Sequence, residues 1–222
     1  YFHDSPATQK KDIVKKVVIE EGVTSIGDYA FFGYSSLTSI EIPESVTSIG
    51  IYAFFNCTGL KSITIPKSVA SVGDKAFSGC IALKEVLLEG GSTLTSENFG
   101  EVADKVVTRW NEGELTWTLT ADGTMTISGK GAMKAYNWDS GSPATQEKDS
   151  VKKVVIEDGV TSIGDDAFSG TPWLTNKRQE NDSLVIVNGI LIDGRTCSGE
   201  VTIPNNVTSI GESAFFNCIG LT

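Results

Sequence analysis

Few residues of this chain could carry out acid–base, nucleophilic or metal chemistry. The 222 residues include a single histidine, His3, so neither a histidine-dependent catalytic triad nor a histidine-rich metal site can be assembled. The adjacent acids Asp165-Asp166 and Glu20-Glu21 are typical of a solvated surface, and the chain contains no EF-hand spacing. We therefore expect no enzyme activity, no cofactor and no metal ion.

Four cysteines are the other reactive side chains. Cys57, Cys80 and Cys218 occupy the same place in three copies of a repeated sequence, which predicts that they pack inward as small buried side chains. A spacing of about 4.8 Å between adjacent strands does not forbid a disulfide between Cys57 and Cys80, but parallel Cβ vectors fit its dihedral angle poorly. Cys197 is out of register, so we expect it to lie in a loop and to react first with a thiol reagent.

Four tryptophans lie outside the regular repeats: Trp110, Trp117, Trp138 and Trp173. Such rings could seal the end of a hydrophobic core, or they could form a platform that binds a sugar or a peptide. We favour sealing, with carbohydrate binding through these tryptophans as an alternative.

The elements that must position these side chains come from a repeat. The stretch 23–31 returns nearly unchanged at 46–54, 69–77, 160–168 and 207–215. Three consecutive units of 23 residues cover 17–39, 40–62 and 63–85. A period of about 20 to 29 residues is typical of a solenoid, because one unit cannot bury its own apolar side and its neighbours must stack on it.

Within a unit, alternating residues predict one strand whose Ile40 and Ile42 point inward. Pro43 ends this strand, because proline cannot donate to a ladder. Gly50 permits a turn, and 51–55 is expected to form a 3₁₀ or single α turn. Applied to all units, the pattern predicts parallel strands centred near Val18, Glu41, Thr64, Val155 and Thr202.

These units resemble the BspA-like leucine-rich repeats of bacterial cell-surface proteins, whose pattern is Leu-x-x-Ile-x-Ile-Pro-x-x-Val-x-x-Ile-Gly-x-x-Ala-Phe-x-x-Cys. The resemblance covers about 17–88 and 151–222. It implies an α/β-type, strand-rich and right-handed solenoid, with a parallel sheet on the concave face and short helical turns on the convex side. It also implies a surface-exposed or secreted bacterial protein that adheres to host or matrix proteins or to other cells.

From residue 89 to 150 the repeat stops. Apolar residues from Phe99 to Trp110 recur at helical spacing, with Thr95 or Ser96 as a possible N-cap. The alternation of 105–111 instead favours a closing strand. Two alternating strands around Asp122-Gly123, at 115–128, predict an antiparallel hairpin outside the parallel sheet. This hairpin resembles the N-terminal cap module of the family.

The second array is less regular. The predicted strands that start at Val154 and Val201 are 47 residues apart, about two units. Between them we expect one degenerate repeat with a polar loop at 176–183 and a two-residue hairpin turn at Asn188-Gly189. The predicted segments are therefore 1–88, a first array with a truncated cap; 89–112, a closing or linking segment; 113–150, the cap hairpin module; and 151–222, the second array.

Composition and surface chemistry suggest the kind of partner. Acidic residues outnumber basic ones by 28 to 18, a net charge of −10, which disfavours nucleic acid and anionic membranes. No apolar run approaches the roughly 18 residues that cross a bilayer. The predicted concave face carries mainly hydroxyl and mixed charged groups, which suit a protein partner better than a small substrate. Its candidate binding residues are Thr38, Ser39, Glu41, Lys61, Ser62, Thr64, Lys84 and Glu85. We expect a protein-interaction or adhesion module, with a passive spacer as the alternative.

Overall fold

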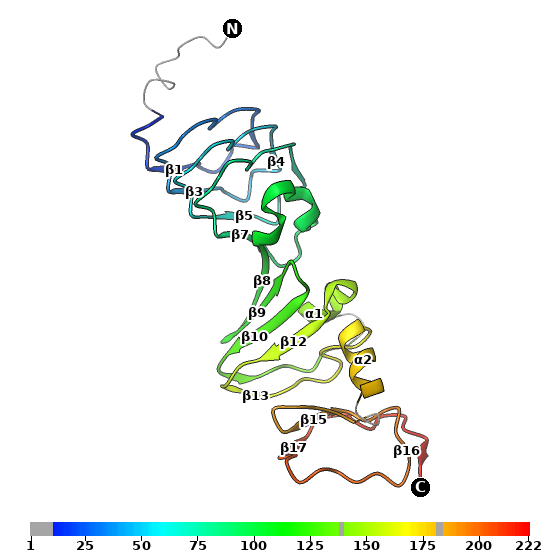
Figure 1. Cartoon of the computed structure of the whole chain (residues 1–222). Helices are drawn as coiled ribbons and strands as arrows, with labels where there is room; N and C mark the ends of the chain where they lie inside the picture. Colours follow the sequence, from blue (N-terminus) through cyan, green and yellow to red (C-terminus); the bar gives the residue numbers. More distant parts are fainter. Residues whose placement is uncertain (1–10, 138–139, 181–183) are drawn as a thin grey trace. The chain divides into compact units, whose positions relative to one another are not determined.

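The computed structural model describes residues 11–137, 140–180 and 184–222, so His3 and Trp138 lie outside the described residues. The chain forms two compact units, Tyr1–Arg109 and Trp110–Thr222, and the boundary between them falls within strand β8 (Val106–Glu112) (Figure 1).

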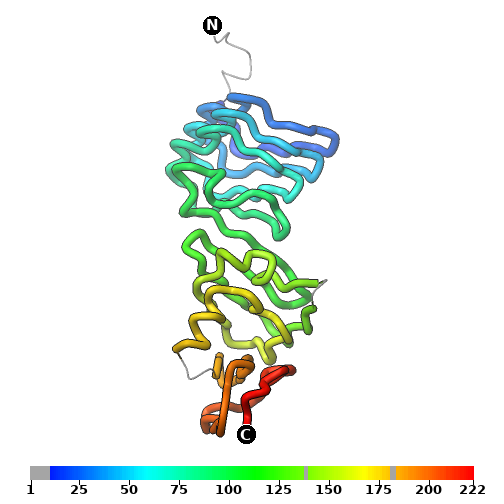
Figure 2. Tube along the Cα trace, turned by 90° about the vertical axis from the view of Figure 1, so that its right-hand side faces the viewer, coloured from blue at the N-terminus to red at the C-terminus, as the bar shows by residue number. Residues whose placement is uncertain are grey.

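The first unit is a stack of coils that each contribute one strand to parallel pairs (Figure 2). The register joins residues 23 positions apart, such as Lys16 with Ser39 and Ser62 with Glu85. The predicted period and the strands expected near Val18, Glu41 and Thr64 are therefore confirmed. The pairs are β1 (Lys16–Val18) with β3 (Ser39–Glu41), β5 (Ser62–Ile65) with β7 (Glu85–Glu89), and β7 with the start of β8.

Each coil also adds a two-residue strand to a second parallel ladder, which the sequence did not lead us to expect. Its members are β2 (Ser25–Ile26), β4 (Ser48–Ile49) and β6 (Ser71–Val72). The isoleucines of β2 and β4 are buried. The two ladders thus enclose a shared apolar interior.

The turn that follows each of these short strands is a run of β-turns, and not the short helix that was expected. Tyr29 and Tyr52 have positive φ angles of 58° and 55°. Tyr29 N donates to the Ile51 carbonyl at 3.0 Å, and Phe31 N donates to the Ala53 carbonyl at 2.7 Å. Because alternate amides bond to the next coil, they cannot also build a helical ladder. We call the stack of these turns the turn column.

The core of the first unit consists of ladders of identical residue types. Phe31, Phe54 and Phe77 stack with centroids 5.2 Å apart at each step and nearly parallel rings. Phe54 and Phe77 are buried, and so are the isoleucines of β3 and β5 that alternate with exposed residues. The strand alternation therefore places apolar side chains inside, as predicted.

The segment after the first array contains both alternatives suggested by its sequence. A 3₁₀ helix, η1 (Ser96–Lys105), starts after Thr95 as N-cap and is kinked at Gly100, whose φ is 51°. Strand β8 follows directly and pairs with β7. Phe99 and Val102 of η1 are buried in the first core, so the helix covers apolar side chains while the strand continues the ladder.

The second unit begins with the expected antiparallel hairpin, β9 (Leu115–Thr120) and β10 (Thr124–Gly129). The prediction that this hairpin lies outside the parallel sheet is wrong. β10 also pairs in parallel with β12 (Lys153–Ile156), with Met125 opposite Val154. β10 is thus bonded to β9 along one edge and to β12 along the other, and it is the first strand of the new parallel ladder. The strand expected near Val155 is confirmed as β12.

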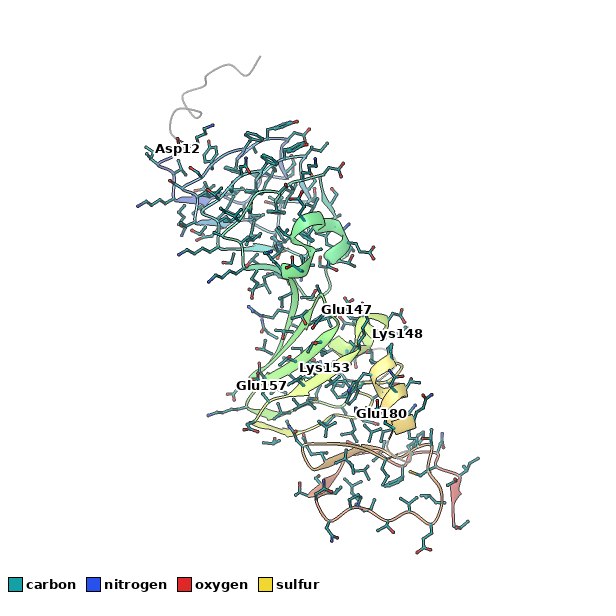
Figure 3. The ribbon with its side chains drawn as sticks, viewed as in Figure 1. Asp12, Glu147, Lys148, Lys153, Glu157 and Glu180 are labelled. Atoms are coloured by element: carbon teal, nitrogen blue, oxygen red, sulfur yellow. The ribbon has the colours of Figure 1, made fainter. Side chains whose placement is uncertain are left out.

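Short elements connect the hairpin to the second array. In the second unit, the short strands that correspond to β2, β4 and β6 are β11 (Gly131–Ala132) and β13 (Val160–Ser162), which pair in parallel. Between them lie α1 (Pro143–Gln146), whose N-cap is Ser142, and η2 (Lys148–Ser150). Lys148 and Lys153 are labelled in Figure 3 and mark η2 and the start of β12.

The degenerate repeat contains a helix where a polar loop was predicted. α2 spans Pro172–Glu180, which replaces the first part of the loop expected at 176–183; residues 181–183 lie outside the described residues. Proline at the first helical position suits the fixed φ, and Thr171 Oγ1 accepts a hydrogen bond from Leu174 N at 3.2 Å. Trp173 and Leu174 are buried, so the helix is held by its first turn.

The predicted two-residue hairpin of this repeat is confirmed. β14 (Val185–Val187) and β15 (Ile190–Asp193) are antiparallel, and Asn188 and Gly189 have φ angles of 49° and 75°. Both values are those of a type I′ turn. β15 then pairs in parallel with β17 (Ser209–Ile210).

The strand predicted near Thr202 is not formed, since 201–204 has no regular structure. In a regular array its partner would lie 23 residues earlier, near Arg178, but Arg178 belongs to α2. Without a strand beside it, the segment lacks a ladder partner. The other pair of the last repeat is β16 (Ser198–Gly199) with β18 (Gly220–Leu221).

Candidate functional site

The eight predicted binding residues lie together on the outward side of the first-unit strands, which we call the strand face. Ser39 and Glu41 belong to β3, Ser62 and Thr64 to β5, and Glu85 to β7. Thr38, Lys61 and Lys84 immediately precede the same strands. Seven of the eight are exposed and Glu85 is half-buried. Strand alternation directs the five that belong to strands away from the core, and the other three are exposed just before the strands begin.

The charges on the strand face are partly paired. Lys16 Nζ lies 2.5 Å from Glu41 Oε1, and Arg109 Nη2 lies 3.8 Å from Glu85 Oε1. Because these side chains are exposed or half-exposed, each pair contributes at most about 1 kcal/mol. Lys16 and Arg109 were not among the predicted site residues; the register places them opposite Ser39 and Glu89, and not opposite the acids that they contact.

Three of the four tryptophans are core residues. Trp110, Trp117 and Trp173 have exposed fractions of 9%, 0% and 5%. Trp173 packs edge-on against Phe168, with centroids 5.0 Å apart, and Trp117 lies 5.9 Å from the same ring. Trp110 Nε1 donates to Gln146 Oε1 at 3.3 Å. Buried rings cannot stack on a ligand, so these three tryptophans seal the core of the second unit.

The cysteines are all among the described residues and are thiols, not disulfides. Cys57 and Cys80 are buried, and their Sγ atoms donate to the Phe31 and Phe54 carbonyls of the preceding coil. The Cys80 thiol and burial together raise the pKa of Cys57. Cys218 is only partly buried.

Cys197 lies in the loop between β15 and β16, as predicted, but it is buried there, which is contrary to the expectation that it reacts first. Its exposed fraction is 5%, and it packs with Leu184, Leu191 and Ala214 in a small cluster. Burial, together with nearby Cys218, raises the pKa of Cys197. Cys197 is out of register because it belongs to the degenerate repeat, which has α2 and the β14–β15 hairpin in place of a regular coil.

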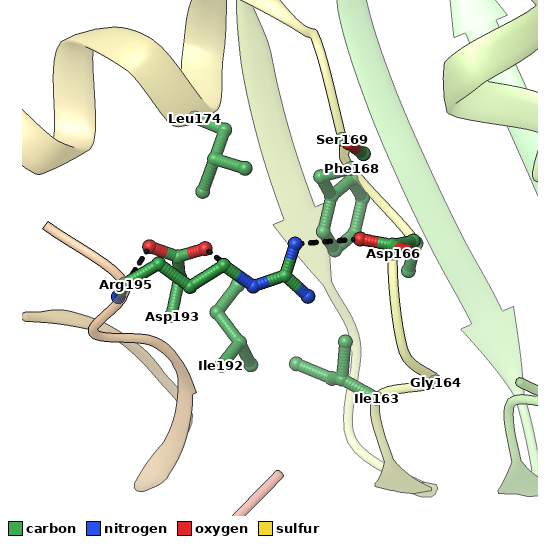
Figure 4. Close-up of a pocket in the computed structure, with 10 residues that line it drawn as sticks. Ile163, Gly164, Asp166, Phe168, Ser169, Leu174, Ile192, Asp193 and Arg195 are labelled. Atoms are coloured by element: carbon green, nitrogen blue, oxygen red, sulfur yellow. Dashed lines mark hydrogen bonds and ion pairs between the residues drawn. The ribbon is translucent and has the colours of Figure 1, made fainter. Parts of the chain in front are cut away.

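A charged cluster in the second unit was not predicted (Figure 4). Arg178 Nε and Nη2 donate to the two carboxylate oxygens of buried Asp193 at 2.9 and 2.7 Å. These hydrogen bonds raise the pKa of Arg178. Arg195 donates to Asp166 at 2.8 Å and to Asp165 at 3.0 Å. Asp165-Asp166 was identified as a solvated pair, but the arginine that binds it is 29 positions away, which no local pattern reveals.

The acids of this cluster are held in ion pairs. Their guanidinium partners remain protonated at any physiological pH. Within residues 11–137, 140–180 and 184–222, no three His, Cys, Asp or Glu side chains gather in a way that could hold a metal ion. In the same ranges, every helix is too short or too polar to cross a lipid bilayer.

Solved structures of leucine-rich repeat proteins are similar to this chain. One is a leucine rich cell surface protein from Faecalibacterium prausnitzii A2-165, with 26% identity over 98% of this chain and 55% of that protein, and a TM-score of 0.34. Another, from Eubacterium ventriosum ATCC 27560, has 20% identity over 98% of this chain and 61% of that protein, and a TM-score of 0.33. A third, from Bacteroides ovatus ATCC 8483, has 18% identity over 93% and 77%, and a TM-score of 0.21.

The chain thus spans little more than half the length of the first two structures. No curated protein matches it significantly. The model of the BspA type leucine rich repeat region matches six copies, over residues 7–104 and 141–222. These ranges cover most of the chain and include all the regular coils described above. The chain therefore belongs to the BspA-type leucine-rich repeat family.

Proposed function

We propose that this chain is a protein-interaction and adhesion module of a bacterial surface or secreted protein, and that it binds macromolecular partners through the strand face. The observation that carries the proposal is the row of exposed polar side chains that stand in register at 23-residue spacing on paired strands. Family membership and the charge of −10 favour an extracellular protein partner over nucleic acid.

The chemistry of the strand face favours a broad contact over a small ligand. Hydroxyl groups and single charges alternate along it, and the apolar side chains of the same strands are occupied in the core. Ordered strands bring these groups to a partner at low conformational cost. We expect modest affinity for one module, which tandem modules would increase by raising the effective concentration.

The alternative is a passive spacer that displays other domains. To distinguish the two, Glu41, Lys61 and Lys84 are replaced together by alanine in the full chain. The matched control replaces Lys67, Asp74 and Lys75, an acid and two lysines that lie on turns. Both variants lose the same net charge, so any difference between them reports the position of the charges.

Binding to a panel of immobilised extracellular-matrix proteins is measured, with the fold checked by circular dichroism. We expect the strand-face variant to lose at least tenfold in affinity, about 1.4 kcal/mol, and the turn variant to bind like the original. If only the turn variant loses binding, the strand face is the wrong surface. If the original chain binds no protein, the spacer is the better explanation.

A further inference from the structure

The turn column is continuous in the first unit and interrupted in the second. In the first unit, each turn donates directly to the next, as Tyr29 N does to Ile51 and Tyr52 N does to Asp74. In the second unit, the equivalent turns at 164–170 and 211–217 are 47 residues apart, and the repeat between them contains α2 and the β14–β15 hairpin. One turn of the column is therefore replaced by a short link at 194–197.

This short link fills only part of the missing turn. Gly194 N donates to the Ala214 carbonyl at 2.7 Å, as a regular coil would do. A Cβ at Gly194 would lie 2.5 Å from the Phe215 ring, so the backbone approaches as closely as glycine allows. The Arg195 side chain covers the remaining distance. Its Nη1 donates to Asp166 of one turn (Figure 4), and its Nε donates to the Ser213 carbonyl of the other at 3.4 Å.

Beside Arg195 the interruption leaves an open cleft of about 970 Å³ within the second unit. Ligand sites in proteins measure about 300–1,000 Å³, so the cleft is large enough for a short oligomer. Its walls come from the cap module, the two separated turns and the link, represented by Gln146, Ser169, Thr196, Phe216 and Asn217.

The charges at the cleft are mostly paired. Lys148, Arg178 and Arg195 line it, as do Asp165 and Asp166, and Arg178 is bound to Asp193, which is outside the lining. Three cations and two acids therefore line the cleft, and both arginines are already in ion pairs. A charged ligand would have to compete with these pairs, whereas a neutral one would not.

The other polar groups at the cleft are amides and hydroxyls, including Gln146, Ser169, Thr196 and Asn217. They can both donate and accept, as sugar hydroxyl groups require. Phe216, at the cleft wall, is 62% exposed and offers an apolar ring beside them. Rings with one apolar surface next to polar groups are suited to such mixed ligands. We propose that this cleft binds a neutral oligosaccharide.

The test uses the full chain and isothermal titration with neutral trisaccharides, namely cellotriose, maltotriose, xylotriose, mannotriose and N-acetylchitotriose. We expect at least one to bind with a Kd below about 1 mM. Phe216→Ala should weaken that binding at least tenfold. Phe55→Ala is the matched control, because Phe55 has the same position in the repeat but lies in the first unit, and it should bind like the original chain.

A second matched pair of variants distinguishes loss of the binding site from a folding defect in Phe216→Ala. Ser169→Trp should fill the cleft and abolish binding, while Ser78→Trp, at the same repeat position in the first unit, should leave it unchanged. Absence of binding to all five sugars overturns the proposal. So does unchanged binding in both cleft variants, or tighter binding of trigalacturonate than of every neutral sugar. None of these results depends on the strand face, so the two proposals fail independently.

Discussion

At the residue scale, the stability of this protein depends on whether a side chain occupies a core ladder or the strand face. Phe54 is fully buried, and its ring is stacked between Phe31 and Phe77. Thr64 lies on β5 between buried Ile63 and Ile65 but points outward. The two positions differ in burial and not in distance from the middle of the array, which makes them a fair comparison.

We expect Phe54→Ala to lower the free energy of unfolding by roughly 3 to 5 kcal/mol, since it removes a large buried ring and leaves a cavity. Thr64→Ala should change the free energy by no more than about 0.5 kcal/mol. Urea titration followed by circular dichroism measures both values. Equal destabilisation by the two substitutions would mean that the inward and outward faces have been exchanged.

The thiols provide a second prediction at this scale. At pH 8, a maleimide should label partly buried Cys218 before buried Cys57, Cys80 and Cys197. The pKa of Cys57 is raised, so less of its reactive thiolate is present at that pH. Mass spectrometry of peptides from a labelling time course measures the order. Rapid labelling of native Cys57 or Cys197 contradicts it, and all four thiols should react after denaturation.

At the scale of the element, neighbouring turns approach so closely that a glycine is required between them. A Cβ at Gly50 would lie 2.5 Å from Asp28 N in the preceding turn, and Gly73 has the same relation to Ile51 N. Gly50 does not have a positive φ. The prediction that it permits a turn is therefore incomplete, because its main role is to let one coil rest against the previous one.

Gly27 and Gly50 occupy the same repeat position and differ in this contact. A Cβ at Gly27 would have no described atom within 4 Å. We expect Gly50→Ala to destabilise the first unit by about 1 to 3 kcal/mol, as overpacking does, and Gly27→Ala to change it by less than about 1 kcal/mol. Thermal unfolding of the two variants tests this. If both lower the Tm equally, loss of backbone freedom and not close approach is the cause.

At the scale of the whole molecule, the hydrophobic clusters respect the division into two units. The first cluster runs from Ile26 to Val106, and the other two contain only residues from Trp110 onward. In a solenoid each repeat is stabilised mainly by its nearest neighbours. A core defect should therefore spread through its own unit and stop before the next.

Hydrogen exchange measured by mass spectrometry can locate the effect of such a defect. Phe54→Ala should accelerate amide exchange in 17–109 and leave 110–222 nearly unchanged. Phe168→Ala, the same repeat position in the second unit, should show the reverse pattern. Accelerated exchange along the entire chain in either variant would show that the two units unfold together.

The sequence alone determined those features that depend on neighbours in the chain or on a constant spacing. The 23-residue period predicted the ladders through Val18, Glu41 and Thr64, and alternation predicted which side of each strand is buried. Asn188-Gly189 predicted its turn because its two residues adopt positive φ readily. The strand-face residues were identified as one outward set for the same reason, while their role in binding is still a prediction.

Only the tertiary structure decided what happens where the repeat fails. In those regions, the structure of a segment depends on which distant segment lies beside it and can pair with it. β10 joins the parallel sheet because β12 meets its edge, and 201–204 has no strand because α2 takes the place of its partner. The burial of Cys197, the bridge made by Arg195 and the cleft beside it follow from the same substitution of a helix and a hairpin for one regular coil. These are contacts between residues far apart in the chain, and no local spacing encodes them.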